Sequence, residues 1–436
     1  MNDLIITNGR VIDPFSGADG EHNVVVHNGK IAGLEKGSKK RNGRHGVRVI
    51  DVEGAIVAPG FVDLHVHLRE PGFEYKEDIK SGLKAAVAGG FTSVCSMPNT
   101  SPVNDNAGVT EYILKRASVL GLARIYPVGA ISKELEGKAM ADVGDQAGAG
   151  AVALSDDGRS VMNSLFMRRA AEYADTFNLP IIDHCEDMVL AANGVMNEGA
   201  VSTELGLLGI PAAAEEAHVA RDIAIARLTC AHFHITHIST AASVEMVRAA
   251  KKKKINITCD VTPHHLTLTE ESVRSYNTSF KMNPPLRTAS DIKELIRGLA
   301  DGTIDAVATD HAPHGLVDKE LPFDSASFGV TGLETALPVL LKLVNEKKIT
   351  LKKMIELLTC GLNALRGMNH SAGFKKGAVA DITIFNPRMK VAIDSSKFYS
   401  KGRNTPFEGW KLNGKVLYTL VGGRVVFDHE NGITTA

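Results

Sequence analysis

The sequence has 436 residues, of which 44% are hydrophobic and 23% charged, as in ordinary globular proteins. Its 49 basic and 50 acidic side chains leave a formal net charge of −1, so no overall field favours nucleic acid or an anionic membrane. No apolar run approaches the ~18 residues of a membrane span, and the five cysteines are odd in number and widely spaced. We therefore expect an untargeted cytoplasmic protein with reduced cysteines and no nucleic-acid or membrane partner.

Both ends of the chain are predicted to be rich in β-strands. Short β-branched runs alternate with Gly and Asn over the first 55 or so residues, and the same pattern returns at residues 380–385 and 418–426. We expect residues 1–55 and 369–436 to form one small composite β-sandwich domain.

The central region alternates short apolar strands with helix-length amphipathic runs, such as residues 164–178, 215–230 and 240–254. This alternation predicts a parallel sheet. Eight candidate strands end near His67, Met97, Gly129, Ser155, His184, His237, Asp260 and Asp310. Eight strands over ~250 residues are typical of a (β/α)8 TIM barrel, so we predict an α/β fold with such a barrel over residues 56–368.

Histidines and an aspartate stand at the ends of several predicted strands. His65 and His67 are separated by one residue, so both imidazoles project from the same face of their strand. A His-x-His pair alone is a weak signal, but His184, His237 and Asp310 also stand where strands stop. Because the carboxyl ends of barrel strands meet at one mouth, we expect these five side chains to converge there.

Four imidazoles and a carboxylate suit Zn²⁺ and could also accept Mn²⁺ or Co²⁺. The absence of a cysteine cluster argues against a closed structural zinc site and favours an open catalytic one. Two neighbouring ions would need a bridging anionic ligand, and the fourth strand offers Asp156 and Asp157. The residues alone do not choose between these two aspartates.

Four motifs occur in an order that is typical of one enzyme family. They are residues 65–72 (HVHLREPG), 96–100 (SMPNT), 155–158 (SDDG) and 309–314 (TDHAPH). With them the chain resembles, over essentially its whole length, the dihydroorotases of the long bacterial type in the amidohydrolase superfamily. The resemblance implies zinc-dependent, reversible cyclisation of N-carbamoyl-L-aspartate to (S)-dihydroorotate plus water, the third step of pyrimidine biosynthesis.

The resemblance also implies roles for the clustered residues. His65, His67 and Asp310 would hold a first zinc ion. His184 and His237 would hold a second, so that two ions per subunit are favoured over one. Asp157 would bridge them, and Asp310 would be the catalytic residue that moves a proton. Related hydantoinases and allantoinases typically bridge their metals with a carboxylated lysine, but residues 150–158 contain no lysine.

The implied substrate carries a carboxylate, which suits a guanidinium because the planar fork can bind both oxygens. By resemblance, this group is Arg69. The full substrate-binding set implied by the family is His67, Arg69, Asn99, Asn283, His314, Phe328 and Gly329. His311 and Cys185 should point away from the site, and we expect His264 and His265 to shape the mouth rather than bind metal.

Two other functions are compatible with parts of the pattern. One is another cyclic amidohydrolase, such as a hydantoinase, dihydropyrimidinase or allantoinase, which Arg69 and the missing bridge lysine disfavour. The other is an inactive subunit that scaffolds aspartate transcarbamoylase; such paralogues typically lack metal ligands, whereas all six are present here. The resemblance further implies a homodimer and an association with aspartate transcarbamoylase.

Overall fold

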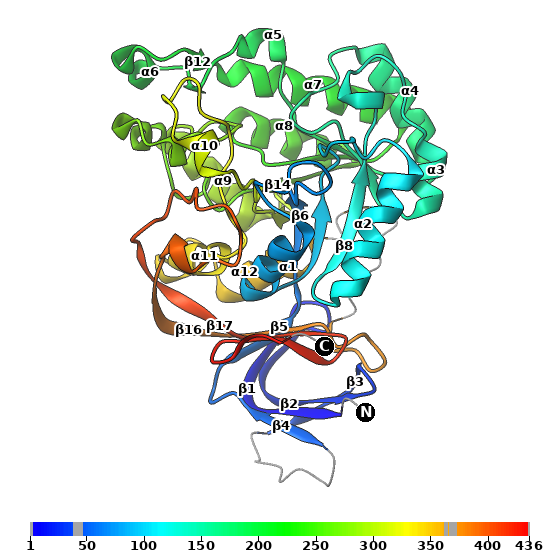
Figure 1. The fold of residues 1–436 in the computed structure, drawn as a ribbon, viewed down its shortest axis with the longest axis vertical. Helices are drawn as coiled ribbons and strands as arrows, with labels where there is room; N and C mark the ends of the chain where they lie inside the picture. The colour runs from blue at the N-terminus through cyan, green and yellow to red at the C-terminus, as the bar shows by residue number, and fades with distance from the viewer. Residues whose placement is uncertain (1–2, 38–46, 362–364, 366–372, 435–436) are drawn as a thin grey trace.

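The computed structural model describes residues 3–37, 47–361, 365 and 373–434. The chain forms a barrel of parallel strands and, below it in Figure 1, a sheet built from both termini. The domain boundary expected between residues 368 and 369 lies outside the described residues. Within the described ranges, no helix has the length and apolar character needed to cross a membrane.

An eight-stranded sheet of parallel pairs forms the barrel, in the order β15-β14-β13-β10-β9-β8-β7-β6. The strands are β6 (Phe61–Val66), β7 (Phe91–Ser96), β8 (Arg124–Gly129), β9 (Ala153–Leu154), β10 (Ile181–Asp183), β13 (Phe233–Ile235), β14 (Ile257–Val261) and β15 (Ala306–Val307). Val66 forms a parallel bridge with His311, and the His67 N–H donates to the His311 carbonyl at 2.8 Å, which joins the first strand to the segment after the last. The predicted eight strands and TIM barrel are confirmed.

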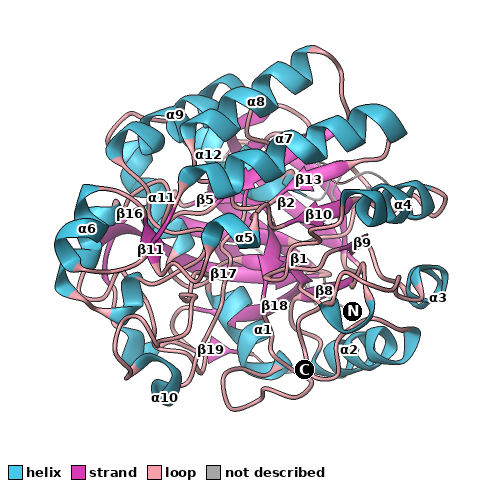
Figure 2. Cartoon of the chain, turned by 90° about the horizontal axis from the view of Figure 1, so that it is seen from above, coloured by secondary structure: helices cyan, strands magenta, loops and turns pink. Residues whose placement is uncertain are grey.

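Helices form a ring outside these strands when the molecule is seen from above (Figure 2). They are α1 (Ile79–Ala88), α2 (Ala107–Leu120), α3 (Val143–Ala149), α4 (Ser164–Asp175), α7 (Ala212–Thr229), α8 (Ala241–Lys252), α9 (Ala289–Asp301), α11 (Ala336–Asn345) and α12 (Leu351–Thr359). The amphipathic runs predicted at residues 164–178, 215–230 and 240–254 correspond to α4, α7 and α8. Side-chain caps fix several starts; the Asp78 carboxylate, for example, accepts from the Ser81 N–H at 2.7 Å.

Shorter elements lie in the segments that follow the strands. They are η1 (Lys133–Leu135), α5 (Met188–Ala191), β11 (Met196–Asn197), α6 (Ala200–Leu205), β12 (Gly209–Ile210), η2 (Glu270–Ser275), η3 (Thr278–Phe280) and α10 (Leu316–Lys319). Such segments carry the polar side chains of the site in barrels of this kind.

Both termini contribute to a nine-stranded sheet in the order β19-β18-β17-β16-β5-β1-β2-β3, with β4 beside β1. Its strands are β1 (Leu4–Asp13), β2 (Ala18–His27), β3 (Lys30–Lys36), β4 (Arg48–Asp51), β5 (Ile56–Pro59), β16 (Ile382–Ala392), β17 (Lys411–Val421), β18 (Arg424–Asp428) and β19 (Gly432–Ile433). The sheet bends so that its two halves face each other around buried side chains such as Ile6, Val24, Ile382 and Leu420 (Figure 1). The predicted composite of both termini is confirmed.

Aromatic side chains join this sheet to the barrel. Phe61 and Phe91 stand at the amino ends of β6 and β7, with ring centroids 6.0 Å apart, and Phe385 of β16 lies 5.9 Å from Phe61. All three are fully buried. The terminal sheet therefore packs at the amino ends of the barrel strands, which leaves the carboxyl ends free to form a site.

Candidate active site

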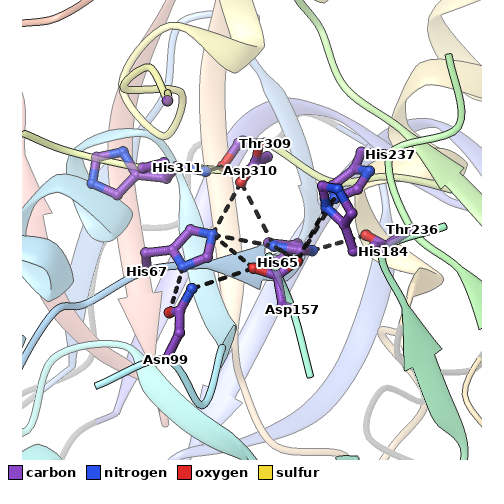
Figure 3. A network of polar contacts seen from close by, with 12 residues as sticks. His65, His67, Asn99, Asp157, His184, Thr236, His237, Thr309, Asp310 and His311 are labelled. Carbon is purple, nitrogen blue, oxygen red and sulfur yellow. Dashed lines mark hydrogen bonds and ion pairs between the residues drawn. The ribbon is translucent and has the colours of Figure 1, made fainter. Parts of the chain in front are cut away.

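The six predicted metal ligands converge at the carboxyl ends of five barrel strands (Figure 3). Each is buried, with no more than 6% of its surface exposed. In chain order they are His65 in β6, His67 just after β6, Asp157 after β9, His184 after β10, His237 after β13 and Asp310 after β15.

A first group consists of His65, His67 and Asp310. The two Nε2 atoms of His65 and His67 are 3.3 Å apart, and the Asp310 Oδ1 lies 3.6 and 3.2 Å from them. Ligand atoms held about 2.0–2.1 Å from a tetrahedral zinc ion are roughly 3.3 Å from one another. These three side chains could therefore hold one such ion without rearrangement.

A second group consists of His184 and His237, whose Nδ1 and Nε2 atoms are 3.0 Å apart. The Asp157 Oδ1 lies 3.6 Å from the former and 3.8 Å from the latter. The same oxygen is 3.4 Å from the His65 Nε2, and the Asp157 Oδ2 is 3.5 Å from the His67 Nε2. Asp157 thus lies between the two groups, in the position that a bridging carboxylate requires.

The neighbouring Asp156 faces away from this cluster. Its Oδ1 accepts from the backbone N–H groups of Ile131 at 2.8 Å and Ser132 at 3.0 Å, and its Oδ2 accepts from the Ser132 hydroxyl. Burial raises the pKa of Asp156 to about 6. Asp156 holds the loop after β8, which leaves Asp157 as the aspartate of this pair that faces the histidines.

Polar neighbours orient the imidazoles of the first group. The His67 Nδ1 lies 2.9 Å from the Asn99 Oδ1, and the His65 Nδ1 lies 2.8 Å from the Thr236 hydroxyl, which donates to Asp260 at 3.1 Å. If each Nδ1 carries the proton, both Nε2 lone pairs face the cluster, as metal binding requires. Thr236 and Asp260 were not predicted to take part in the site, although their positions at strand ends were a usable signal.

The charges of the cluster favour a bound cation. Burial disfavours charge on His65 and His184, but nearby carboxylates, Asp157 foremost, outweigh this effect and raise the pKa of each to about 9. Burial also disfavours charge on Asp157 and Asp310, yet the surrounding imidazoles hold the pKa of both carboxyls below the ordinary value. The carboxylates are therefore ionised at neutral pH and attract positive charge, either protons on the histidines or metal ions.

Three side chains of the site stand on left-handed backbone, where residues other than glycine are uncommon: Arg69 at φ 61°, His237 at φ 39° and Asp310 at φ 48°.

His311 helps to fix the segment after Asp310. Its Nδ1 accepts from the Gly332 N–H at 3.2 Å, and its Nε2 is 3.4 Å from a Glu77 carboxylate oxygen. As predicted, the His311 ring points away from the cluster (Figure 3).

A cavity of about 560 Å³ opens onto the cluster. The residues predicted to bind substrate all line it: His67, Arg69, Asn99, Asn283, His314, Phe328 and Gly329. Arg159 and Ser327 also line the cavity, and sequence reasoning missed both.

Hydrogen bonds position several of these lining groups. The Arg69 Nε donates to the Pro313 carbonyl at 3.3 Å, and the His314 Nε2 lies 2.7 Å from the Phe328 carbonyl. Burial and the charge of Arg69 hold the pKa of His314 well below its ordinary value, so this imidazole is neutral. Of Arg69 and His314, only Arg69 therefore carries a positive charge.

His265 and Cys185 near the mouth have structural partners, whereas the buried Nε2 of His264 has no hydrogen-bond partner among the described residues. The His265 Nδ1 lies 2.8 Å from the Thr262 hydroxyl and its Nε2 2.9 Å from the Pro284 carbonyl, which anchors the segment that carries Asn283. The Cys185 Sγ faces the Asp222 carboxylate at 3.3 Å. The Asn283 Nδ2 donates to the Glu186 carboxylate at 3.1 Å, a partner that the sequence did not suggest.

Comparison with known proteins places this chain in a family. The Dihydro-orotase-like family model matches residues 54–243. A protein named dihydroorotase from Anaeromyxobacter sp. (strain K) is 51% identical over 433 residues, which cover 98% of each chain. The chain belongs to the dihydroorotase family. A second member, the dihydroorotase of Syntrophus aciditrophicus (strain SB), is 49% identical over 98% of this chain and 100% of its own.

The chain shares its fold with a solved hydantoinase structure. L-Hydantoinase from Arthrobacter aurescens covers 100% of this chain with a TM-score of 0.87 and 22% sequence identity, over 98% of its own length. At that identity the similarity shows the fold alone. The family resemblance predicted from the four sequence motifs is thus confirmed by the dihydroorotases, and the predicted barrel with its terminal sheet by the hydantoinase.

Proposed function

We propose that this protein is a metal-dependent dihydroorotase, which converts N-carbamoyl-L-aspartate to (S)-dihydroorotate and water, and catalyses the reverse hydrolysis. One observation carries the proposal: a cluster of four histidines and two carboxylates shares a cavity with a guanidinium, that of Arg69. The whole-chain identity of 51% to a dihydroorotase points to the same activity. The family membership makes a cyclic amide hydrolase the expected class of enzyme.

The proposed metal is zinc, with two ions per subunit. His65, His67 and Asp310 would hold one ion, His184 and His237 the other, and Asp157 would bridge them. The separations of 3.0 to 3.8 Å between neighbouring ligand atoms support this arrangement. When bound, zinc would lower the pKa of a water molecule and polarise the amide carbonyl of the substrate.

Asp310 is the proposed proton carrier. In hydrolysis, its carboxylate would accept a proton from the attacking water and deliver it to the leaving amide nitrogen, and in cyclisation the same steps run backwards. The imidazole of His67, 3.2 Å from the Asp310 Oδ1, helps to hold the pKa of Asp310 below the ordinary value. The carboxylate is therefore ionised and ready to accept the proton.

Arg69 is the proposed anchor for the carboxylate that both substrates carry. Its guanidinium can bind the two carboxylate oxygens in parallel, and the neutral side chains of Asn99 and His314 would add hydrogen bonds. This contact would orient the ring so that its amide faces Asp310 and the histidines. Substrates without the carboxylate would lose the contact.

The purified protein is accordingly expected to hydrolyse dihydroorotate far faster than hydantoin, dihydrouracil or allantoin. The three competitors carry no carboxylate for Arg69. Initial rates with all four compounds, measured on one preparation of known metal content, test the proposal. Preferential turnover of hydantoin or allantoin would show that the protein resembles the hydantoinases in specificity as well as in fold.

Replacement of Arg69 by methionine is expected to raise KM for dihydroorotate about 100-fold, because a charge-assisted, two-point contact contributes roughly 1.5–3 kcal/mol. Zinc content should stay unchanged, since Arg69 is not a proposed ligand. Arg297→Met, on the exposed surface of α9, is the matched control and should behave like the wild type. An unchanged KM in the Arg69 variant would remove the carboxylate anchor from the proposal.

A homodimer, an association with aspartate transcarbamoylase and a cytoplasmic location are proposed from the family resemblance and from cysteine usage. All five cysteines are free thiols in the structure, which fits a reducing compartment. Light scattering of the purified chain, alone and mixed with aspartate transcarbamoylase, tests the two assemblies.

A further inference from the structure

Two buried lysines stand behind the part of the cavity wall formed by Ser327, Phe328 and Gly329. Lys281 follows η3 and is 2% exposed, and Lys319 ends α10 and is 8% exposed. In the described part of the chain, the hydrogen bonds of both ammonium groups go to backbone carbonyls, and neither group forms an ion pair with a carboxylate. Desolvated ammonium groups without a counter-ion are costly and call for a physical explanation.

Lys319 connects three segments through backbone oxygens. Its Nζ donates to the carbonyls of Ser327 at 2.7 Å, Gly329 at 3.0 Å and Lys281 at 3.3 Å. The Gly329 N–H donates in turn to the Lys281 carbonyl at 3.0 Å. Two carbonyl oxygens of the cavity wall are therefore engaged by Lys319, which keeps their negative ends from repelling an anion in the cavity.

Lys281 lies behind the aromatic part of the same wall. Its Nζ donates to the Asp324 carbonyl at 2.8 Å and lies 4.6 Å from the centroid of the Phe328 ring and 5.8 Å from that of Phe323. Phe328 lines the cavity, so one ring separates this ammonium group from the space where substrate would sit.

The nearby carboxylates of Asp318 and Asp324 favour the charged forms of Lys319 and Lys281, but the opposing effect of burial is larger. Asp318, next to Lys319 on α10, pairs with Lys76 at 3.4 Å, and its other oxygen is 3.8 Å from the His314 Nδ1. The Asp324 carboxylate accepts from the Ser325 hydroxyl at 3.0 Å. Lys319 and Lys281 act on each other, and Arg69, Lys76 and Lys319 all act on His314, so this side of the cavity gathers positive charge.

We propose that Lys281 and Lys319 are positioning residues that make the cavity selective for an anion: they fix the 327–329 wall and supply countercharge to the substrate carboxylate held by Arg69. This inference rests on the proposed dihydroorotase activity. The substrate carboxylate would supply the negative charge that the two ammonium groups lack in the free protein. A neutral cyclic amide would supply no such charge.

A dependence of substrate affinity on pH follows. Burial lowers the pKa of Lys319 to about 7 and that of Lys281 to about 8. An anion in the cavity favours the charged lysines and so raises both pKa values. Binding is therefore tightest below pH 7, weakens as pH rises through 7 to 8, and levels off at higher pH. Each pKa unit by which the anion shifts a lysine corresponds to a ten-fold change in affinity.

The test measures kcat and KM for dihydroorotate from pH 6 to 9.5 on zinc-loaded protein. In the wild type, KM should rise about 100-fold across the range, about ten-fold for each of the two lysines whose pKa the anion raises by one unit. Lys319→Met should have a KM about ten-fold higher at pH 6.5 and a flattened pH profile, with kcat changed by less than about three-fold. Lys319→Arg keeps the charge at all pH values, so its KM should stay low at pH 8.5.

Two further variants complete the test. Lys281→Met should flatten the profile near pH 8, and it serves as the independent variant if Lys319→Met fails to fold by circular dichroism. Lys293→Met, on the exposed face of α9, should follow the wild-type curve. The inference is overturned if Lys281→Met and Lys319→Met both show the wild-type dependence of KM on pH. It is also overturned if Lys319→Met and Lys319→Arg raise KM equally at every pH. A wild-type protein that turns over only neutral cyclic amides would instead contradict the proposed function, and this inference with it.

Discussion

Asp310→Asn is expected to lower kcat for dihydroorotate by about 10³-fold, because an asparagine at this position cannot accept the proton of the attacking water. The substitution keeps the shape of the side chain and one oxygen, so the buried contact with His67 at 3.2 Å can persist. The fold should therefore survive. Steady-state kinetics in both directions measure the loss, and kcat/KM must fall by the same factor in each because the equilibrium constant does not change.

The control for this variant is Asp301→Asn, at the end of α9, where the carboxylate pairs with Arg248 near the surface. It removes one negative charge from the protein but lies away from the cavity lining. Its kcat should equal that of the wild type. Circular dichroism and zinc analysis of both variants separate lost proton transfer from lost folding or lost metal. Wild-type activity in Asp310→Asn, at full metal content, would refute the assigned role.

Removal of metal by a chelator is expected to reduce turnover to background, and added Zn²⁺ should restore it. Without zinc, the chain would retain its substrate contacts but lose the source of an ionised water molecule at neutral pH. The melting temperature should also fall, because an ion that binds only the folded state stabilises that state. Full activity in protein shown to be free of metal would contradict the proposal.

Titration of the metal-free protein with zinc distinguishes one ion from two. If Asp157 bridges two ions, activity should rise until about two equivalents have bound. Asp157→Asn should weaken zinc binding in both groups, because each Asp157 oxygen contacts an imidazole of the first group and Oδ1 also faces both histidines of the second. A break at one equivalent would instead favour a single ion.

The barrel and the convergence of five of the six clustered residues, all except Asp157, could be predicted from the residues alone, because both depend on backbone periodicity. Polar residues at the carboxyl ends of parallel strands must share one mouth, whatever their separation along the chain. For the same reason, the side chains of His67 and Asp310 meet although they are 243 residues apart. His311 points away from the cluster as expected, but strand alternation is not the cause, because β15 ends at Val307 and Asp310 lies on left-handed backbone.

Features that depend on loop conformation could not be predicted from the residues alone. Asp156 and Asp157 are adjacent carboxylates, and only the folded loop shows that Ile131 and Ser132 bind the first of them. The buried Lys281 and Lys319 look like surface lysines in a sequence. They are buried because the loop after β14 packs against the loop after β15. No local sequence pattern predicts this contact.

The order in which the barrel closes has a consequence for synthesis. His67 donates to the carbonyl of His311, so the first strand is held by a segment that the ribosome produces much later. A nascent or prematurely terminated chain would expose the His65–His67 pair without Asp310 opposite it. The complete cluster of six side chains therefore exists only after this closure, in the last stage of assembly. A product truncated before Asp310 would lack one carboxylate of the cluster.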